Sequence, residues 1–125
     1  MTDGDRLFVP LKSEHYRNFE SGLKDVELRG YGSGFNTATV VTGRPVELRR
    51  GYNTNDSLLG VIGHVATHDA IDEVADVWDH TRIVPGTNRR EFEAGAEALL
   101  SPYDRFISFA VGNISDEPPA AVSTP

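Results

Sequence analysis

SGLKDVELRGYGSG, residues 21–34, predicts in turn the end of a helix, a strand and a glycine-rich loop. Gly22 follows a segment with apolar residues at helical spacing and is well placed to end that helix in a left-handed conformation. Residues 25–31 then alternate, with Val26 and Leu28 on one face and polar side chains on the other, which is typical of a half-buried strand. A helix that passes into a strand through one tight turn is therefore the first element of the fold that the sequence predicts.

Three charged side chains come close together in this turn and strand. Glu27 and Arg29 share a strand face, and Lys24 joins them only if the chain bends after Gly22. Lys24 is suited to offer an ammonium to a carbonyl or phosphate, and Arg29 a planar fork of donors to a base edge. Glu27 is suited to accept a hydrogen bond from an exocyclic amine, or to act as a general base if its pKa is raised. The alternative is a solvated surface pair of Glu27 and Arg29, which would contribute only about 0–1 kcal/mol.

The segments on either side predict short strands and a few helices. Residues 6–12 predict a strand in which Pro10 points to a sheet edge or a bulge, and Ser13 is a plausible N-cap for the helix that ends at Gly22. The later elements expected are a loop over 32–44 that includes a short strand at 39–41, strands over 45–50, 58–67 and 106–114, and helices over 71–78 and from Asn88, where Glu91 completes a capping box.

This order of elements favours an α+β domain built on a small curved sheet or barrel. We expect residues 1–114 to form a single domain. Residues 115–125 lack any core-forming pattern and are expected to be a disordered C-terminal tail.

Composition limits the class of protein. The chain of 125 residues is long enough for one modest core and contains no cysteine, which excludes disulfides and thiolate metal sites. No stretch approaches the roughly 20 apolar residues that cross a bilayer, and the N-terminus lacks an apolar signal core. A cytoplasmic protein with no membrane contact is therefore expected.

The net charge of −7 is unevenly distributed. Residues 1–55 carry eight Lys/Arg and seven Asp/Glu, whereas residues 56–125 carry four and twelve. Any nucleic-acid contact is therefore expected in the N-terminal half. The acidic C-terminal half would also suit a protein-interaction domain without a small ligand, or a salt-adapted source. The sequence does not distinguish between these explanations of the acidic charge. It also does not specify the oligomeric state.

The charged turn and strand carry a motif that resembles the signature GxKxxExR of the ASCH family, a branch of the PUA-like β-barrel superfamily, through Gly22, Lys24, Glu27 and Arg29. The resemblance extends to FVPLK (residues 8–12), where a strand ends near a lysine, and to GRPVELRRGY (residues 43–52), so that it spans residues 6–114. It implies a PUA-like barrel of about five or six strands with flanking helices and a cleft beside the motif. Family members have been proposed to bind RNA, and related PUA-like domains hold a nucleobase in such a cleft.

On this resemblance, we expect the chain to bind RNA or a modified nucleoside in a charged cleft. The expected ligand-binding residues are the motif's Lys24, Glu27 and Arg29, together with Lys12, the aromatic residues Tyr31 and Tyr52 as stacking surfaces, and Arg49 as a phosphate contact. No cofactor and no metal ion is expected. His64 and His68 would lie about 13 Å apart on a regular strand, too far to share a metal, so structural or surface roles are expected for them.

Hydrolysis is the alternative function. One ASCH branch hydrolyses the amide of N4-acetylcytidine, and another member has been described as a ribonuclease. The amidase branch carries a threonine, taken as its nucleophile, where this chain has Glu27, and its second glutamate has no clear match, since Asp79 and Glu91 are only the nearest acids. A bound water is the remaining nucleophile, with Glu27 as its base and Lys24 stabilising the oxyanion. The sequence leaves open whether the chain is an enzyme.

Overall fold

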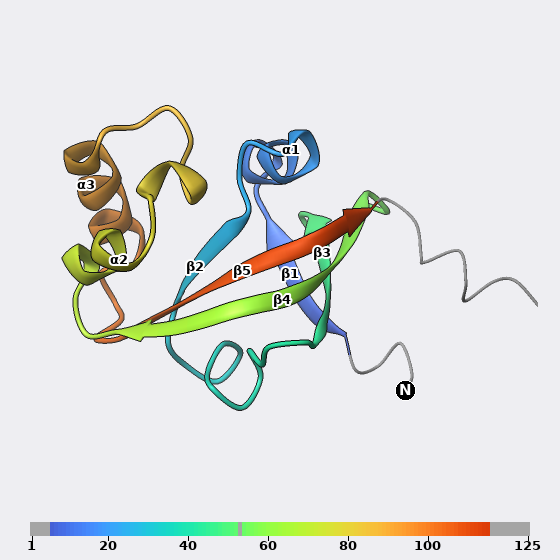
Figure 1. Cartoon of the computed structure of the whole chain (residues 1–125), viewed down its shortest axis with the longest axis horizontal. Helices are drawn as coiled ribbons and strands as arrows, with labels where there is room; N and C mark the ends of the chain where they lie inside the picture. Colours follow the sequence, from blue (N-terminus) through green and yellow to red (C-terminus); the bar gives the residue numbers. More distant parts are fainter. Residues whose placement is uncertain (1–5, 53, 116–125) are drawn as a thin grey trace, which may run out of the picture.

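The structure is a computed structural model, and it describes residues 6–52 and 54–115. Within these residues, five β-strands form one sheet that is accompanied by three α-helices and a short 3-10 helix (Figure 1). The elements in chain order are β1 (Leu7–Leu11), α1 (Ser13–Ser21), β2 (Val26–Gly30), β3 (Pro45–Arg50), β4 (Ser57–His68), α2 (Ile71–Val77), η2 (His80–Arg82), α3 (Arg89–Leu99) and β5 (Phe106–Ser115). None of the described helices is long and apolar enough to cross a membrane.

The sheet is mixed and has the strand order β1-β3-β4-β5-β2. β1 runs parallel to β3, and the other neighbouring strands are antiparallel. The pairing of the long strands β4 and β5 is interrupted by register shifts, and the sheet curves into a half-barrel with β1 and β2 at its two edges (Figure 1). The predicted α+β architecture on a curved sheet is therefore confirmed. Pro10 lies on the edge strand β1, as expected, because proline has no N–H to give to a second neighbour.

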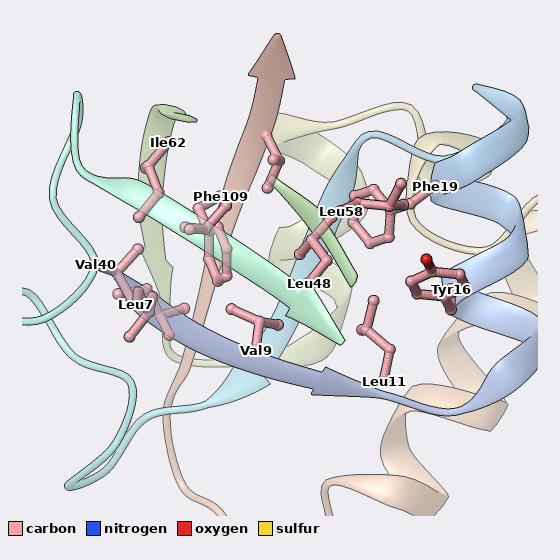
Figure 2. Close-up of a cluster of buried hydrophobic side chains, with 13 residues drawn as sticks. Leu7, Val9, Leu11, Tyr16, Phe19, Val40, Leu48, Leu58, Ile62 and Phe109 are labelled. Carbon is pink, nitrogen blue, oxygen red and sulfur yellow. The ribbon is translucent and has the colours of Figure 1, made fainter. Parts of the chain in front are cut away.

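β5 is buried on both faces, and each face belongs to a different core. Positions 107, 109 and 111 join a cluster that α1 closes with Tyr16 and Phe19, which we call the α1 core (Figure 2). Positions 106 and 110 pack on the opposite face against α2 and α3, in the α2–α3 core. The run FISFAV is thus apolar except at Ser108, because helices or strands cover both sides of this strand.

A buried polar group of three side chains lies under α2. Ser108 is fully buried, and its Oγ lies 2.6 Å from Nε1 of Trp78 and 2.7 Å from Nε2 of His68. An indole N–H can only donate, so Ser108 accepts that bond and is free to donate its own proton to His68. Burial also lowers the pKa of His68, which is consistent with a neutral ring. His68 thus has the expected structural role, whereas His64 is exposed beside the Trp78 ring.

The helix ends follow the sequence predictions with one exception. α1 ends at Gly22, which has a left-handed φ of 83°. At the start of α3, Asn88 and Glu91 form the predicted capping box, each side chain bonding the other's backbone N–H. The exception is Ser13, which is the first helical residue of α1, while Lys12 occupies the N-cap position without a side-chain bond.

The short strand expected at 39–41 is wrong, because these residues form a turn. The side chain of Asn36 accepts bonds from the N–H groups of Ala38 and Thr39, and the carbonyl of Asn36 accepts one from Val40. These local bonds use the N–H groups that a strand would need. Of the expected tail, Ser115 still belongs to β5, and residues 116–125 lie outside the described residues.

Gly30→Ala is expected to lower the free energy of unfolding by about 1–3 kcal/mol. Gly30 ends β2, and a methyl group at this position would overlap the ring of Tyr103. Chemical denaturation of this variant alone and in a Tyr103→Ala background checks the effect. Without the ring the added methyl should cost little, and an equal cost in both backgrounds would contradict this explanation.

Candidate functional site

Lys24 is buried where α1 passes into β2, with 1% of its surface exposed. The left-handed turn at Gly22 precedes it, and its Nζ lies 3.2 Å from Oε1 of Glu27, so the predicted bend is present. The same nitrogen donates to the carbonyl oxygens of Val26 at 2.9 Å and Ile83 at 2.5 Å. Three acceptors around one nitrogen match three N–H donors, so the side chain is an ammonium with every hydrogen engaged by the protein.

Glu27 and Arg29 form a partly buried pair at the gap between the two edge strands. Glu27 is 6% exposed and lies opposite Phe109 in the β2–β5 register, so its side chain shares a face with the α1 core. Its Oε2 accepts a bond of 2.6 Å from Nε of Arg29, whose Nη2 donates to the carbonyl oxygen of Pro10 at 2.6 Å. Arg29 also lies over the ring of Phe35 at 4.7 Å. The arginine therefore connects β2 to β1, which a solvated surface pair would not do.

The close packing of Lys24, Glu27 and Arg29, here called the charged cluster, shifts two pKa values. Burial raises the pKa of Glu27, but the charges and hydrogen bonds of Lys24 and Arg29 together outweigh burial and bring the pKa below its ordinary value. Burial lowers the pKa of Lys24, and the attraction of Glu27 opposes that shift. A carboxylate with a lowered pKa is a weak base, so the condition set for Glu27 as a general base, a raised pKa, is not met.

A pocket of about 470 Å³ lies beside the charged cluster, and its lining comes from α1, α3, the end of β1, β2 and the segment between η2 and α3. Its apolar wall is formed mainly by Ile83, Val84, Phe92, Ala96, Leu99 and Leu100. Its charged residues are Lys12, Lys24, Arg29, Glu14, Glu27 and Glu91. Three cations thus balance three carboxylates. The pocket therefore combines an apolar wall with a charged wall whose charges sum to zero. Among residues 6–52 and 54–115, no group of three or more acidic, histidine or cysteine side chains could hold a metal ion.

The structure brings four of the seven predicted ligand-binding residues to this pocket and leaves three outside its lining. Lys12 and the charged cluster line it, but Tyr31, Arg49 and Tyr52 do not. Tyr31 lies in the loop after β2, beneath the guanidinium of Arg105. Arg49 pairs with Glu47 and lies over Phe8, because it points to the outer side of β3. Tyr52 is 73% exposed beside the same Phe8 ring. These three side chains therefore belong to other surfaces of the molecule.

Thirteen of the seventeen residues that line the pocket were not predicted as ligand contacts, and three of them bear on its chemistry or shape. Glu91, expected from the sequence as a capping-box residue and as a nearby acid, lines the pocket, and its carboxylate accepts the Asn88 N–H bond of the capping box. His15 lies in the first turn of α1, three residues after the N-cap residue Lys12, and both residues line the pocket. Gly95 is a glycine inside α3, an unfavourable residue for a helix interior, and a Cβ atom there would meet nothing within 4 Å, so this position leaves open space beside the pocket. Glu91 and Gly95 line the pocket because of the side on which α3 packs against the rest of the fold. The local sequence does not predict that packing.

Comparison with known proteins defines the fold. No model of a protein family and no curated protein matches this chain. Among solved structures, the crystal structure of hypothetical protein PH0355 matches with a TM-score of 0.64 and 13% sequence identity, over 83% of this chain and 94% of that protein. The crystal structure of ASCH from Zymomonas mobilis matches with a TM-score of 0.62 and 10% identity, over 89% of this chain and 69% of that protein. The chain therefore has an ASCH-like fold, as the GxKxxExR motif predicted.

The free energy of unfolding is expected to fall in two stages on acidification. Burial lowers the pKa of His15, with a contribution from Lys24, and burial lowers that of His68, so below pH 6.5 the unfolded chain binds protons more readily than the folded chain. Because the pKa of Glu27 is lowered, its stabilising contribution is present above the ordinary value of 4.5 and is lost as the pH falls below it. Urea denaturation across this pH range checks both stages. Constant stability from neutral pH to about pH 5 would contradict two histidines held neutral.

Proposed function

We propose that this chain binds a nucleobase, carried by a nucleoside or by single-stranded RNA, in the pocket beside the charged cluster. The main support for the proposal is that one pocket of about 470 Å³ has an apolar wall, mostly on α3, and the buried carboxylate of Glu27 on β2. A base has a flat apolar face and a polar edge, and such a ligand needs both kinds of surface. The ASCH-like fold supports the same choice, because the motif resemblance implies a cleft at this place.

Each part of the charged cluster has a distinct role in this proposal. Glu27 faces the pocket as a hydrogen-bond acceptor, since two bonds from Lys24 and Arg29 leave its carboxylate with further lone pairs. Lys24 pairs with Glu27 and donates hydrogen bonds to the carbonyl oxygens of Val26 and Ile83. It therefore stabilises the site but has no N–H left to donate to a ligand. Lys12 is exposed at the pocket rim, where a phosphate of bound RNA would meet it.

Gly95→Leu tests the proposal without disturbing the charged cluster. A Cβ atom at Gly95 meets nothing within 4 Å, so a leucine can extend into the pocket, and leucine favours helix over glycine. The matched control is Ala98→Leu, an exposed position of the same helix that does not line the pocket. Calorimetric titration with ribonucleosides and short single-stranded RNA should show at least a tenfold loss of affinity for Gly95→Leu alone. Unchanged binding by that variant would reject the pocket as the site.

Hydrolysis of an acylated or modified pyrimidine nucleoside, or of RNA, is the second candidate. The contact between Lys24 and Glu27 at the pocket is the observation in its favour. The lowered pKa of Glu27 and the fully engaged ammonium of Lys24 weaken it, since a base and an oxyanion donor are both needed. Incubation with N4-acetylcytidine and with RNA, followed by mass spectrometry, is expected to give no product. Turnover that disappears in Glu27→Gln would establish this second candidate instead.

A further inference from the structure

His15 brings an unpaired polar atom to the pocket wall. It lies on α1 and lines the pocket, and its Nδ1 is buried with no hydrogen-bond partner within the described parts of the chain. A buried polar atom without a partner is unfavourable by about 1–3 kcal/mol, and a ligand in the pocket can supply the missing bond. Burial lowers the pKa of His15, and the charge of Lys24 adds to this effect against the opposing carboxylates of Glu27 and Glu14. A neutral imidazole offers one donor and one acceptor nitrogen.

Lys24 and Arg29, the two cations beside Glu27, are poorly arranged for a phosphate, and the third cation of the pocket, Lys12, lies exposed at its rim. Every ammonium hydrogen of Lys24 is engaged by the protein, and Arg29 uses Nε and Nη2 on Glu27 and Pro10. The three carboxylates of the pocket balance its three cations, so the pocket has no excess of positive charge. Free cationic donors are the strongest contacts for a phosphate, and the charged cluster offers few of them, because Lys24 and Arg29 already bond Glu27 and backbone carbonyl oxygens.

We propose that His15 and Glu27 together recognise the edge of an uncharged heterocyclic base, which enters the pocket as a free nucleoside and is not held through its phosphate. This inference rests on the proposed function and deepens it. Glu27 accepts a bond from an N–H group of the base, and His15 pairs with a second polar atom of the same edge. The flat face of the ring lies against α3 at Gly95, where the missing side chain leaves open space. His15 is then a specificity-determining residue outside the GxKxxExR motif.

The choice of nucleoside over phosphate is tested with the wild-type chain. Calorimetric titrations compare the four ribonucleosides with their 5′-monophosphates at low and high salt. We expect one preferred nucleoside whose monophosphate binds with an affinity within about threefold, and little effect of salt on either, since no phosphate contact is formed. A monophosphate that binds at least ten times more tightly than its nucleoside, and loses this advantage at high salt, would overturn the inference.

The role of His15 is tested with two substitutions at that position. His15→Ala is expected to weaken binding of the preferred nucleoside about tenfold, the worth of one hydrogen bond, and to reduce the preference among the four bases. His15→Asn places an amide near the position of Nδ1 and should restore part of the affinity and preference. His64→Ala, which removes an exposed histidine outside the pocket, serves as the matched control. Thermal unfolding verifies that each variant is folded.

The outcomes separate this inference from the proposed function. If His15→Ala keeps both the affinity and the base preference of the wild type while Gly95→Leu abolishes binding, the pocket is the site and the role of His15 is rejected. If no nucleoside, nucleotide or RNA binds the wild type, the proposed function fails, and the role of His15 fails with it.

Discussion

Lys24→Met is expected to lower the free energy of unfolding by about 3–5 kcal/mol, the usual cost of removing one partner from a buried ion pair. Methionine fills a similar volume but cannot donate. The substitution therefore leaves the buried carbonyl oxygens of Val26 and Ile83 unpaired and leaves Glu27 with Arg29 as its remaining cation. The result would distinguish a lysine that holds the site together from one that contacts the ligand through a free ammonium.

The measurement is urea denaturation followed by circular dichroism, with Lys12→Met as the matched control. Lys12 is the other of the two lysines in the sequence and is exposed. Its replacement should therefore change the free energy of unfolding by less than about 0.5 kcal/mol. A loss below about 1 kcal/mol for Lys24→Met would contradict the geometry described for its ammonium.

Ser108→Ala is expected to lower the free energy of unfolding by about 2–4 kcal/mol. The hydroxyl is fully buried and joins Trp78 to His68, so its removal leaves an indole N–H and an imidazole nitrogen without a partner. Each buried unpaired group costs about 1–3 kcal/mol. Trp78 packs in the same α2–α3 core as Ile83 and Phe92, which line the apolar wall of the pocket.

A double-mutant cycle with Trp78→Phe measures this contribution. Phenylalanine has no N–H, so Ser108→Ala should cost clearly less in the Trp78→Phe background than in the wild type. The same cost in both backgrounds would mean that the indole bond to Ser108 does not contribute to stability.

The fold could be predicted to the extent that local patterns determine it. Pro10 marked an edge strand because proline lacks a donor, and Asn88 with Glu91 marked a helix start because capping is a local interaction. The turn at 36–40 was missed because the side chain of Asn36 bonds the backbone in place of a strand partner. Alternation in β2 was recognised, but alternation alone does not tell whether its polar face meets solvent or a covered pocket.

The candidate site divides in the same way. Lys24, Glu27 and Arg29 could be grouped from the sequence because a single bend separates them. Arg49 and Tyr52 lie away from the pocket because the curvature of the sheet and the position of β3 determine where they point. His15 and Gly95 meet at one pocket only through the packing of α1 and α3, which are far apart in the sequence.

The central claim is that the pocket between α1 and α3 binds a nucleobase. The most direct test is a titration of ¹⁵N-labelled protein with nucleosides, followed by amide chemical shifts. The account predicts saturable shifts concentrated in residues 12–15, 24–29 and 91–100, with small changes near Arg49 and Tyr52. Shifts confined to the Arg49–Tyr52 surface, or no saturable shift with any nucleoside, would contradict it.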